Sequence, residues 1–120
     1  MEQEKKNFTD RYNNLYKDLK AEIINLVQNN PYSKSDCLDF DVYKSNEAVQ
    51  GILMDNMVQG YDEYASCFYD AYVRGIYIYD DGTILVNAYS PLNDCDVDDV
   101  SIAVDSLYTL WYILNEINKL

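Results

Sequence analysis

The sequence predicts an α+β fold in which two amphipathic helices, one at each end of the chain, cover one face of a small antiparallel sheet. Three observations carry this prediction. One apolar stripe with helical spacing opens the chain, a second closes it, and two alternating segments joined by Asp80-Asp81-Gly82 lie between them. The length of 120 residues fits a single domain covering the whole chain, residues 1–120.

The first helix is predicted from apolar residues that recur every three or four positions between Phe8 and Leu26. Charged side chains occupy the positions between them, so one side of this helix is apolar and the other is wet. Asn29-Asn30-Pro31 predicts the end of the helix, because proline disfavours helical geometry in the residue before it.

A β-hairpin is predicted over about residues 73–79 and 83–89, the more C-terminal of the expected strands. Two registers fit the loop. One uses a two-residue Asp81-Gly82 turn, and the other uses a three-residue loop in which Gly82 is left-handed and Tyr79 pairs with Thr83. The second register is preferred, because it collects the aliphatic side chains on one face and most of the tyrosines on the other.

The last helix is expected after Pro91, with an apolar stripe from Val100 to Ile117. Asp96 or Asp98 is expected to cap its start, since side-chain oxygens there accept hydrogen bonds from free backbone N–H groups.

The segment between the first helix and the hairpin is harder to interpret. Alternation of apolar and acidic residues over Leu38–Val42 predicts a strand. Residues 48–58 fit either a short strand or a helix. Aromatic residues with helical spacing favour a helix over 61–71, although the same aromatic content also suits a strand.

The net charge of −12 is unevenly distributed. Residues 36–105 carry fifteen Asp and Glu but only two basic residues, Lys44 and Arg74, whereas residues 1–35 are nearly balanced. Such a field repels nucleic acid and anionic membrane and attracts basic proteins and cations. We therefore expect a basic protein partner, no direct binding to nucleic acid and no association with membranes.

The residue inventory argues against an enzyme. Histidine is absent, which removes Ser-His-Asp triads, Cys-His pairs and His-based metal sites. The four glycines form no phosphate-binding or dinucleotide-binding pattern, so no cofactor is expected. Three cysteines at wide spacing, with no apparent leader segment or membrane span, suggest a soluble cytoplasmic protein with buried free thiols.

A local acidic cluster follows Pro91. Asp94, Asp96 and Asp98 alternate as the first ligands of a calcium loop do. The pattern then departs from such loops, because Asp99 stands where glycine is needed and Asp105 stands where a bidentate glutamate is usual. These three residues are therefore weak metal candidates, and capping of the last helix is the preferred interpretation.

Tyrosine is unusually abundant, with 13 residues against three phenylalanines and one tryptophan. Tyrosine combines a large apolar ring with a polar tip and is enriched at protein interfaces. The expected contact surface combines tyrosines of the hairpin with nearby acids. Its residues are Asp39, Asp41, Tyr43, Tyr77, Tyr79, Asp80, Asp81 and Tyr89.

These observations favour a non-enzymatic interaction module. Its sharpest form is an inhibitor or nucleic-acid mimic, in which carboxylates stand in for phosphates and occupy a nucleic-acid-binding protein. Inhibitors from phages and mobile elements often have this style of composition, although no motif here matches a family. The alternative is a self-associating accessory protein that closes a homodimer through its tyrosines, and a calcium-binding module is a weaker third hypothesis.

Overall fold

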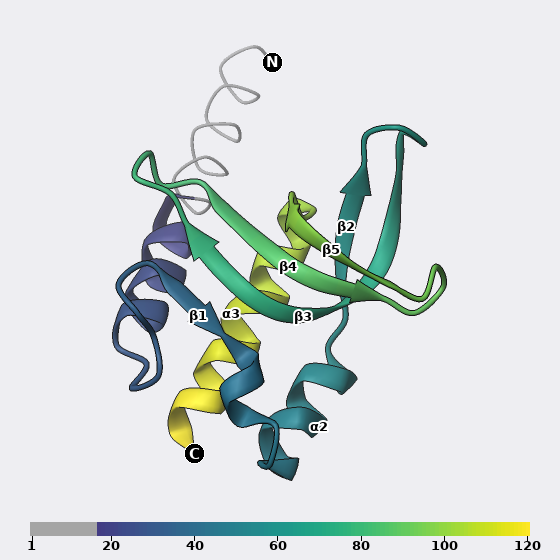
Figure 1. Ribbon diagram of the computed structural model, residues 1–120. Coiled ribbons are helices and arrows are strands. Elements are labelled where there is room, and N and C mark those ends of the chain that lie inside the picture. Colours follow the sequence, from purple (N-terminus) through teal and green to yellow (C-terminus); the bar gives the residue numbers. More distant parts are fainter. Residues whose placement is uncertain (1–16) are drawn as a thin grey trace, which may run out of the picture.

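The computed structural model describes residues 17–120 and confirms the predicted α+β class (Figure 1). A helix over residues 17–28 comes first, and the part of the predicted first helix before it lies outside the described residues. The elements that follow are β1 (Cys37–Asp39), the 3₁₀ helix η1 (Phe40–Tyr43), α2 (Glu47–Asp55), β2 (Val58–Asp62), β3 (Cys67–Ile78), β4 (Ile84–Ser90), β5 (Cys95–Val100) and α3 (Val104–Lys119).

The long strand β3 organises an antiparallel sheet of five strands. One edge of β3 pairs with β4, which in turn pairs with β5, and the other edge is shared by β1 and β2. After β5 the chain crosses back to β2, where Gly60 and Ile102 form a bridge and Tyr61 N donates to Ser101 O at 3.0 Å. The sheet therefore curls until its far edge meets β2, which leaves fewer unpaired strand edges.

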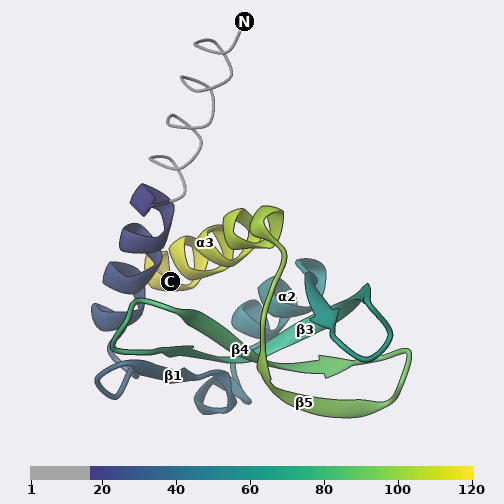
Figure 2. The same ribbon diagram turned by 90° about the horizontal axis from the view of Figure 1, so that it is seen from above.

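The helices lie on one side of the sheet (Figure 2). The core between the two layers is aliphatic. Its fully buried large side chains include Ile23, Val27, Leu38, Val49, Val58, Ile76, Val86, Leu110, Ile113 and Leu114. The other side of β1, β3, β4 and β5 faces solvent (Figure 2), and it carries several acidic side chains and Tyr77.

The predicted hairpin and its preferred register are confirmed. Tyr79 N donates to Thr83 O and Gly82 N donates to Tyr79 O, both at 2.9 Å, and Ile78 lies opposite Ile84. Gly82 has a φ of +85°, a left-handed conformation that glycine adopts without a steric cost. The aliphatic face of both strands is buried as expected.

The strand predicted over Leu38–Val42 is correct only at its start. It ends at Asp39, whose carboxylate accepts a hydrogen bond from Asp41 N at 2.9 Å and caps the 3₁₀ helix η1. Phe40 and Tyr43, three residues apart, are the buried positions, so this stretch follows a helical rather than an alternating period. In the next segment the helical option is correct, since α2 begins at the N-cap Asn46.

The helix predicted over residues 61–71 is wrong. This stretch forms the end of β2, a turn and the start of β3, with Tyr61 paired to Phe68 and Gly60 to Tyr69. Asp62 holds the turn, because its carboxylate accepts hydrogen bonds from Tyr64 N and Ala65 N. Aromatic rings pair well across strands, and that tertiary gain outweighs the helical spacing.

The start of the last helix is also corrected. Residues Cys95–Val100 form β5 along the edge of β4, and α3 begins at Val104 with Ala103 as an N-cap that makes no side-chain hydrogen bond. Asp96 and Asp98 therefore cap no helix. A strand forms here because pairing with β4 satisfies the backbone of this segment, while Val100 is buried and Val97 packs against the core.

Candidate functional site

The helix-free side of the sheet gathers acidic and aromatic side chains from four strands and η1. We call this surface the acidic face and define it by Asp39, Asp41, Arg74, Tyr77, Asn87, Tyr89, Asp96 and Asp98. Most of these residues line one shallow hollow of about 180 Å³, and Tyr89 lies beside it, opposite Asp96. Residues opposite one another in a ladder share a face, so the pairing register brings these distant positions together.

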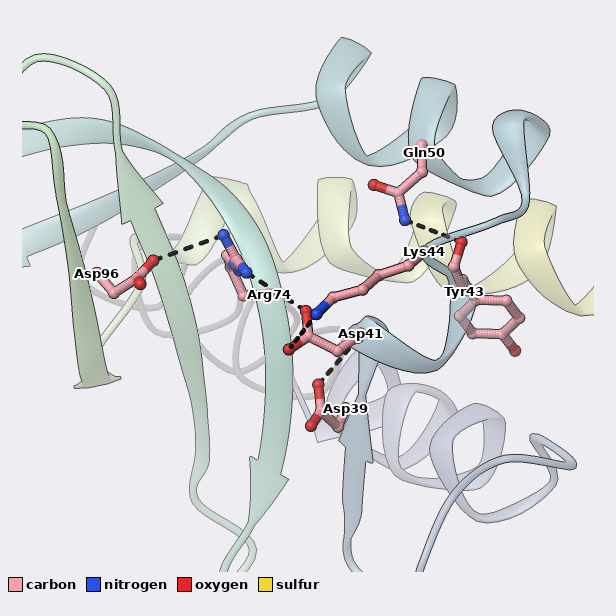
Figure 3. A network of polar contacts seen from close by, with 7 residues as sticks. All are labelled: Asp39, Asp41, Tyr43, Lys44, Gln50, Arg74 and Asp96. Carbon is pink, nitrogen blue, oxygen red and sulfur yellow. Dashed lines mark hydrogen bonds and ion pairs between the residues drawn. The ribbon is translucent and has the colours of Figure 1, made fainter.

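A β-bulge places the one guanidinium of this surface. The register of β3 against β4 shifts between Val73 and Gly75, which leaves Arg74 outside the regular ladder. Its Nη2 atom lies 3.3 Å from Asp41 Oδ1, and its Nη1 atom lies 3.7 Å from Asp96 Oδ1 (Figure 3). Arg74 thus connects an acid before α2 with an acid on β5, at opposite sides of the hollow.

The balance of charge in the hollow is negative. Asp39, Asp41, Asp96 and Asp98 face Arg74, which is the one basic side chain among the described residues lining the hollow. Lys44 approaches Asp41 from the rim, with Nζ 3.9 Å from Oδ2, but its side chain is 73% exposed. Both partners of each ion pair are well exposed, and pairs of this kind stabilise a fold by only about 0–1 kcal/mol.

Two of the predicted tyrosines are tied to carboxylates. The hydroxyl of Tyr79 donates to Asp99 Oδ1 at 3.2 Å, and the hydroxyl of Tyr89 donates to Asp94. In each case the hydrogen bond to a carboxylate raises the pKa of the phenol above its ordinary value. These contacts hold both rings at the surface beside negative charge, an environment suited to a cationic group.

Tyr77 lies in the middle of the face, opposite Cys37 on β1 and Leu85 on β4. The adjacent Cys37 thiol raises the pKa of the Tyr77 phenol above its ordinary value. Its ring is 36% exposed, which leaves part of its apolar surface open for contact.

Four of the predicted contact residues lie outside the acidic face. Tyr43 is buried and donates from its hydroxyl to Asn30 Oδ1 at 3.1 Å, so it belongs to the core rather than to the surface. Tyr79, Asp80 and Asp81 lie together at the end of the hairpin, outside the hollow. The carboxylate of Asp81 accepts a hydrogen bond from Thr83 N, and its interaction with Thr83 lowers the pKa of that carboxyl group.

The sequence pattern misplaced part of the site. Asp96 and Asp98, considered only as caps or metal ligands, lie on the acidic face because they belong to a strand. Asp94 lies in the turn before them. Residues 17–120 contain no group of three or more His, Cys, Asp or Glu side chains arranged to hold a metal ion.

The thiols differ from the expected burial. Cys67 and Cys95 are exposed and Cys37 is half-buried, and all three are free. The structure has strands where the sequence predicts helices around Cys67 and Cys95, and each of these residues begins a strand beside an exposed turn. This position explains why both thiols are exposed.

Within the described chain, no helix combines the length and the apolar character needed to cross a membrane. Comparisons of the sequence and the fold with protein-family models, with curated proteins and with solved structures give no match.

Proposed function

We propose that this chain is a non-enzymatic binding protein that docks on a basic protein through its acidic face. The observation that carries the proposal is the hollow in which four aspartates from β1, η1 and β5 surround Arg74 beside Tyr77. Tyrosines supply contact area with little side-chain entropy to lose, and the surrounding carboxylates attract and orient a positively charged partner.

The shape of the hollow supports recognition of a surface rather than enclosure of a small substrate. Its volume of about 180 Å³ is below the ~300–1,000 Å³ typical of small-molecule pockets. Its lining comes from strands and the short helix η1 rather than from long loops, so the carboxylates are held on a rigid support.

Charge also favours a basic partner over a second copy of this chain on the same face. A two-fold dimer through the acidic face would bring identical patches together. Asp39, Asp96 and Asp98 of one copy would then meet a surface with the same excess of carboxylates on the other copy, and like charges in contact oppose association.

A sharper form of the proposal is mimicry of nucleic acid. Asp39 on β1 and Asp98 on β5 lie on strands separated by β3 and β4. Duplex DNA carries about one negative charge per 1.7 Å of its axis, so a mimic needs closely spaced acids with few compensating bases, and the acidic face has four aspartates around one arginine. A basic DNA-binding protein held on this face would be prevented from holding a duplex.

The test is a calorimetric titration with an oligolysine peptide as the basic probe. The variant Asp39→Asn/Asp98→Asn removes two charges from the acidic face, and asparagine at residue 39 still caps η1. The control Asp18→Asn/Glu22→Gln removes two charges from exposed positions on the helix over residues 17–28. We expect a several-fold loss of affinity for the first variant and a much smaller one for the control, because close charges contribute more than distant, screened ones. Equal losses would show that the peptide responds to net charge alone and would count against the proposal.

Self-association is the second candidate function, and α3 supplies the observation that favours it. Val104, Tyr108 and Tyr112 recur every fourth residue and are all exposed, which forms an uncovered stripe along this helix. Light scattering separates the two candidates, since a homodimer would have twice the monomer mass of 14.0 kDa. Tyr108→Glu should return such a dimer to the monomer, whereas it should leave binding of oligolysine unchanged.

A further inference from the structure

A second concave site lies beside the acidic face, between β5 and the hairpin formed by β2 and the start of β3. We call this hairpin, residues 58–71, the arm, and the space between it and β5 the arm groove. The groove has a volume of about 530 Å³, larger than the hollow of the acidic face. In Figure 1 the arm and the turn between β4 and β5 extend from the same end of the sheet.

Tyrosine rings and carboxylates line the arm groove together. The arm contributes Tyr61, Tyr64 and Tyr69, and carboxylates come from both sides. Among these acids, Asp62 lies on the arm, and Asp98 and Asp99 lie on β5. None of the described residues lining the groove is a lysine or an arginine.

Close packing fixes the position of Tyr69. A Cβ atom at Gly60 would lie 2.8 Å from Cζ of Tyr69 and 2.7 Å from Cγ1 of Val100, so the ring occupies the space that a side chain at residue 60 would fill. Burial, followed by the nearby Asp62 carboxylate, raises the pKa of the Tyr69 phenol. The ring is therefore neutral at physiological pH and rigidly held.

The other two rings are open to solvent. Tyr64 is 103% exposed at the tip of the arm, and Tyr61 is 39% exposed and packs on Phe68 with ring centroids 5.1 Å apart. An aromatic side chain that is exposed without packing contacts can close over a ligand at little cost to the fold. Aromatic faces beside carboxylates attract cations through the ring quadrupole and through charge together.

We propose that the arm groove receives an arginine side chain of the basic partner. The planar guanidinium group stacks on tyrosine and donates several hydrogen bonds to carboxylates, whereas a lysine ammonium is a compact, strongly hydrated charge. Asp98 lines both the arm groove and the hollow of the acidic face, so one partner surface can reach both. This inference rests on the proposed function and adds the residue type that anchors the partner.

The test follows the backbone amide signals of the whole protein by NMR while N-acetyl-arginine methylamide is added. The matched probe is the citrulline analogue, which has nearly the same shape and no charge. We expect arginine to shift the amides of Tyr61, Tyr69, Asp99 and Ser101, with citrulline shifting them little. Equal shifts with citrulline, or no shift of these amides with arginine, would overturn the proposal.

Variants separate stacking from general attraction. Tyr64→Ala removes an exposed ring of the groove, and Tyr112→Ala removes an exposed ring of α3 as the control. We expect Tyr64→Ala to weaken binding of the arginine probe about two- to fivefold, the size of an exposed cation–π contact, and Tyr112→Ala to leave it unchanged. An unchanged affinity in Tyr64→Ala would overturn this role of the ring. If oligolysine still binds the acidic face but the arginine probe does not bind the arm groove, the proposed function stands and only the assignment of an arginine to the groove fails.

Discussion

The guanidinium of Arg74 lies 3.3 Å from the carboxylate of Asp41, although the first residue belongs to a bulge of β3 and the second to η1. The same guanidinium lies 3.7 Å from Asp96 on β5, so a single positive charge links acids on the two sides of the hollow. Arg74 thus lowers the mutual repulsion of the carboxylates, and it competes with any cation that a partner brings to the same place.

Replacement of Arg74 by glutamine should therefore strengthen binding of a basic probe. We expect tighter binding of oligolysine and a steeper dependence on salt, with the free energy of unfolding changing by no more than about 1 kcal/mol. Titration at two salt concentrations measures the first effect and chemical denaturation the second. The control is Lys119→Gln at the end of α3, which changes net charge equally outside the hollow. Weaker binding in Arg74→Gln than in the control would contradict this account.

Gly60→Ala should destabilise the protein by about 1–3 kcal/mol, the usual cost of overpacking. The added Cβ would meet Tyr69 and Val100 at distances shorter than any normal contact. Gly51→Ala in α2 is the matched control, since a Cβ there has no neighbour within 4 Å and alanine favours helix. Denaturant unfolding should show opposite signs for the two variants, and equal stability of both would refute the packing described for the arm groove.

Asn30→Ala should also be destabilising, by about 1–3 kcal/mol, because it leaves buried partners unpaired. The Asn30 side chain is buried, donates to Asn118 Oδ1 at 2.7 Å and accepts from Tyr43 Oη at 3.1 Å. Asn25→Ala is the control, since its side chain is exposed and accepts a hydrogen bond from the exposed side chain of Asn29 at 2.8 Å. We expect that control to change stability by less than about 0.5 kcal/mol. A loss in Asn30→Ala no larger than in the control would contradict a structural role for this residue.

Stability should fall as the pH rises above 10, and Tyr43 contributes to this fall. Its burial raises the pKa of the phenol above the ordinary value of 10.0, so the folded state holds the proton more tightly than the unfolded state. The contribution is fully present below pH 10 and is lost as the pH rises through the pKa of the folded state. Unfolding measured across this range should show a shallower fall in Tyr43→Phe. An identical slope in wild type and variant would exclude the contribution of Tyr43.

The parts of the fold that could be predicted from the sequence are those governed by local chemistry. The hairpin loop is one example, because Gly82 and the alternation beside it select one register. The arm and β5 could not be predicted in the same way. Tyr61 and Phe68 have helical spacing in the sequence, and only their pairing across strands shows why they are extended.

The candidate site likewise has features that could be predicted from the sequence and features that could not. The acids and tyrosines of the acidic face could be found from composition, but their grouping depends on contacts between distant strands. Asp39 on β1 and Asp98 on β5 share the hollow because β3 and β4 pair with these two strands and hold them in one sheet. Arg74 could not be placed from sequence, since its position depends on a β-bulge.

The most direct test of the central claim is an NMR map of the oligolysine contact surface. We predict that the amides of Gly75, Tyr77, Asn87 and Asp96 shift most, and that raising the salt from about 50 to about 500 mM reverses most of these shifts. This result would place a basic ligand on the acidic face. Shifts concentrated on α3 or on the helix over residues 17–28, or shifts indifferent to salt, would contradict the proposal that this face binds a basic partner.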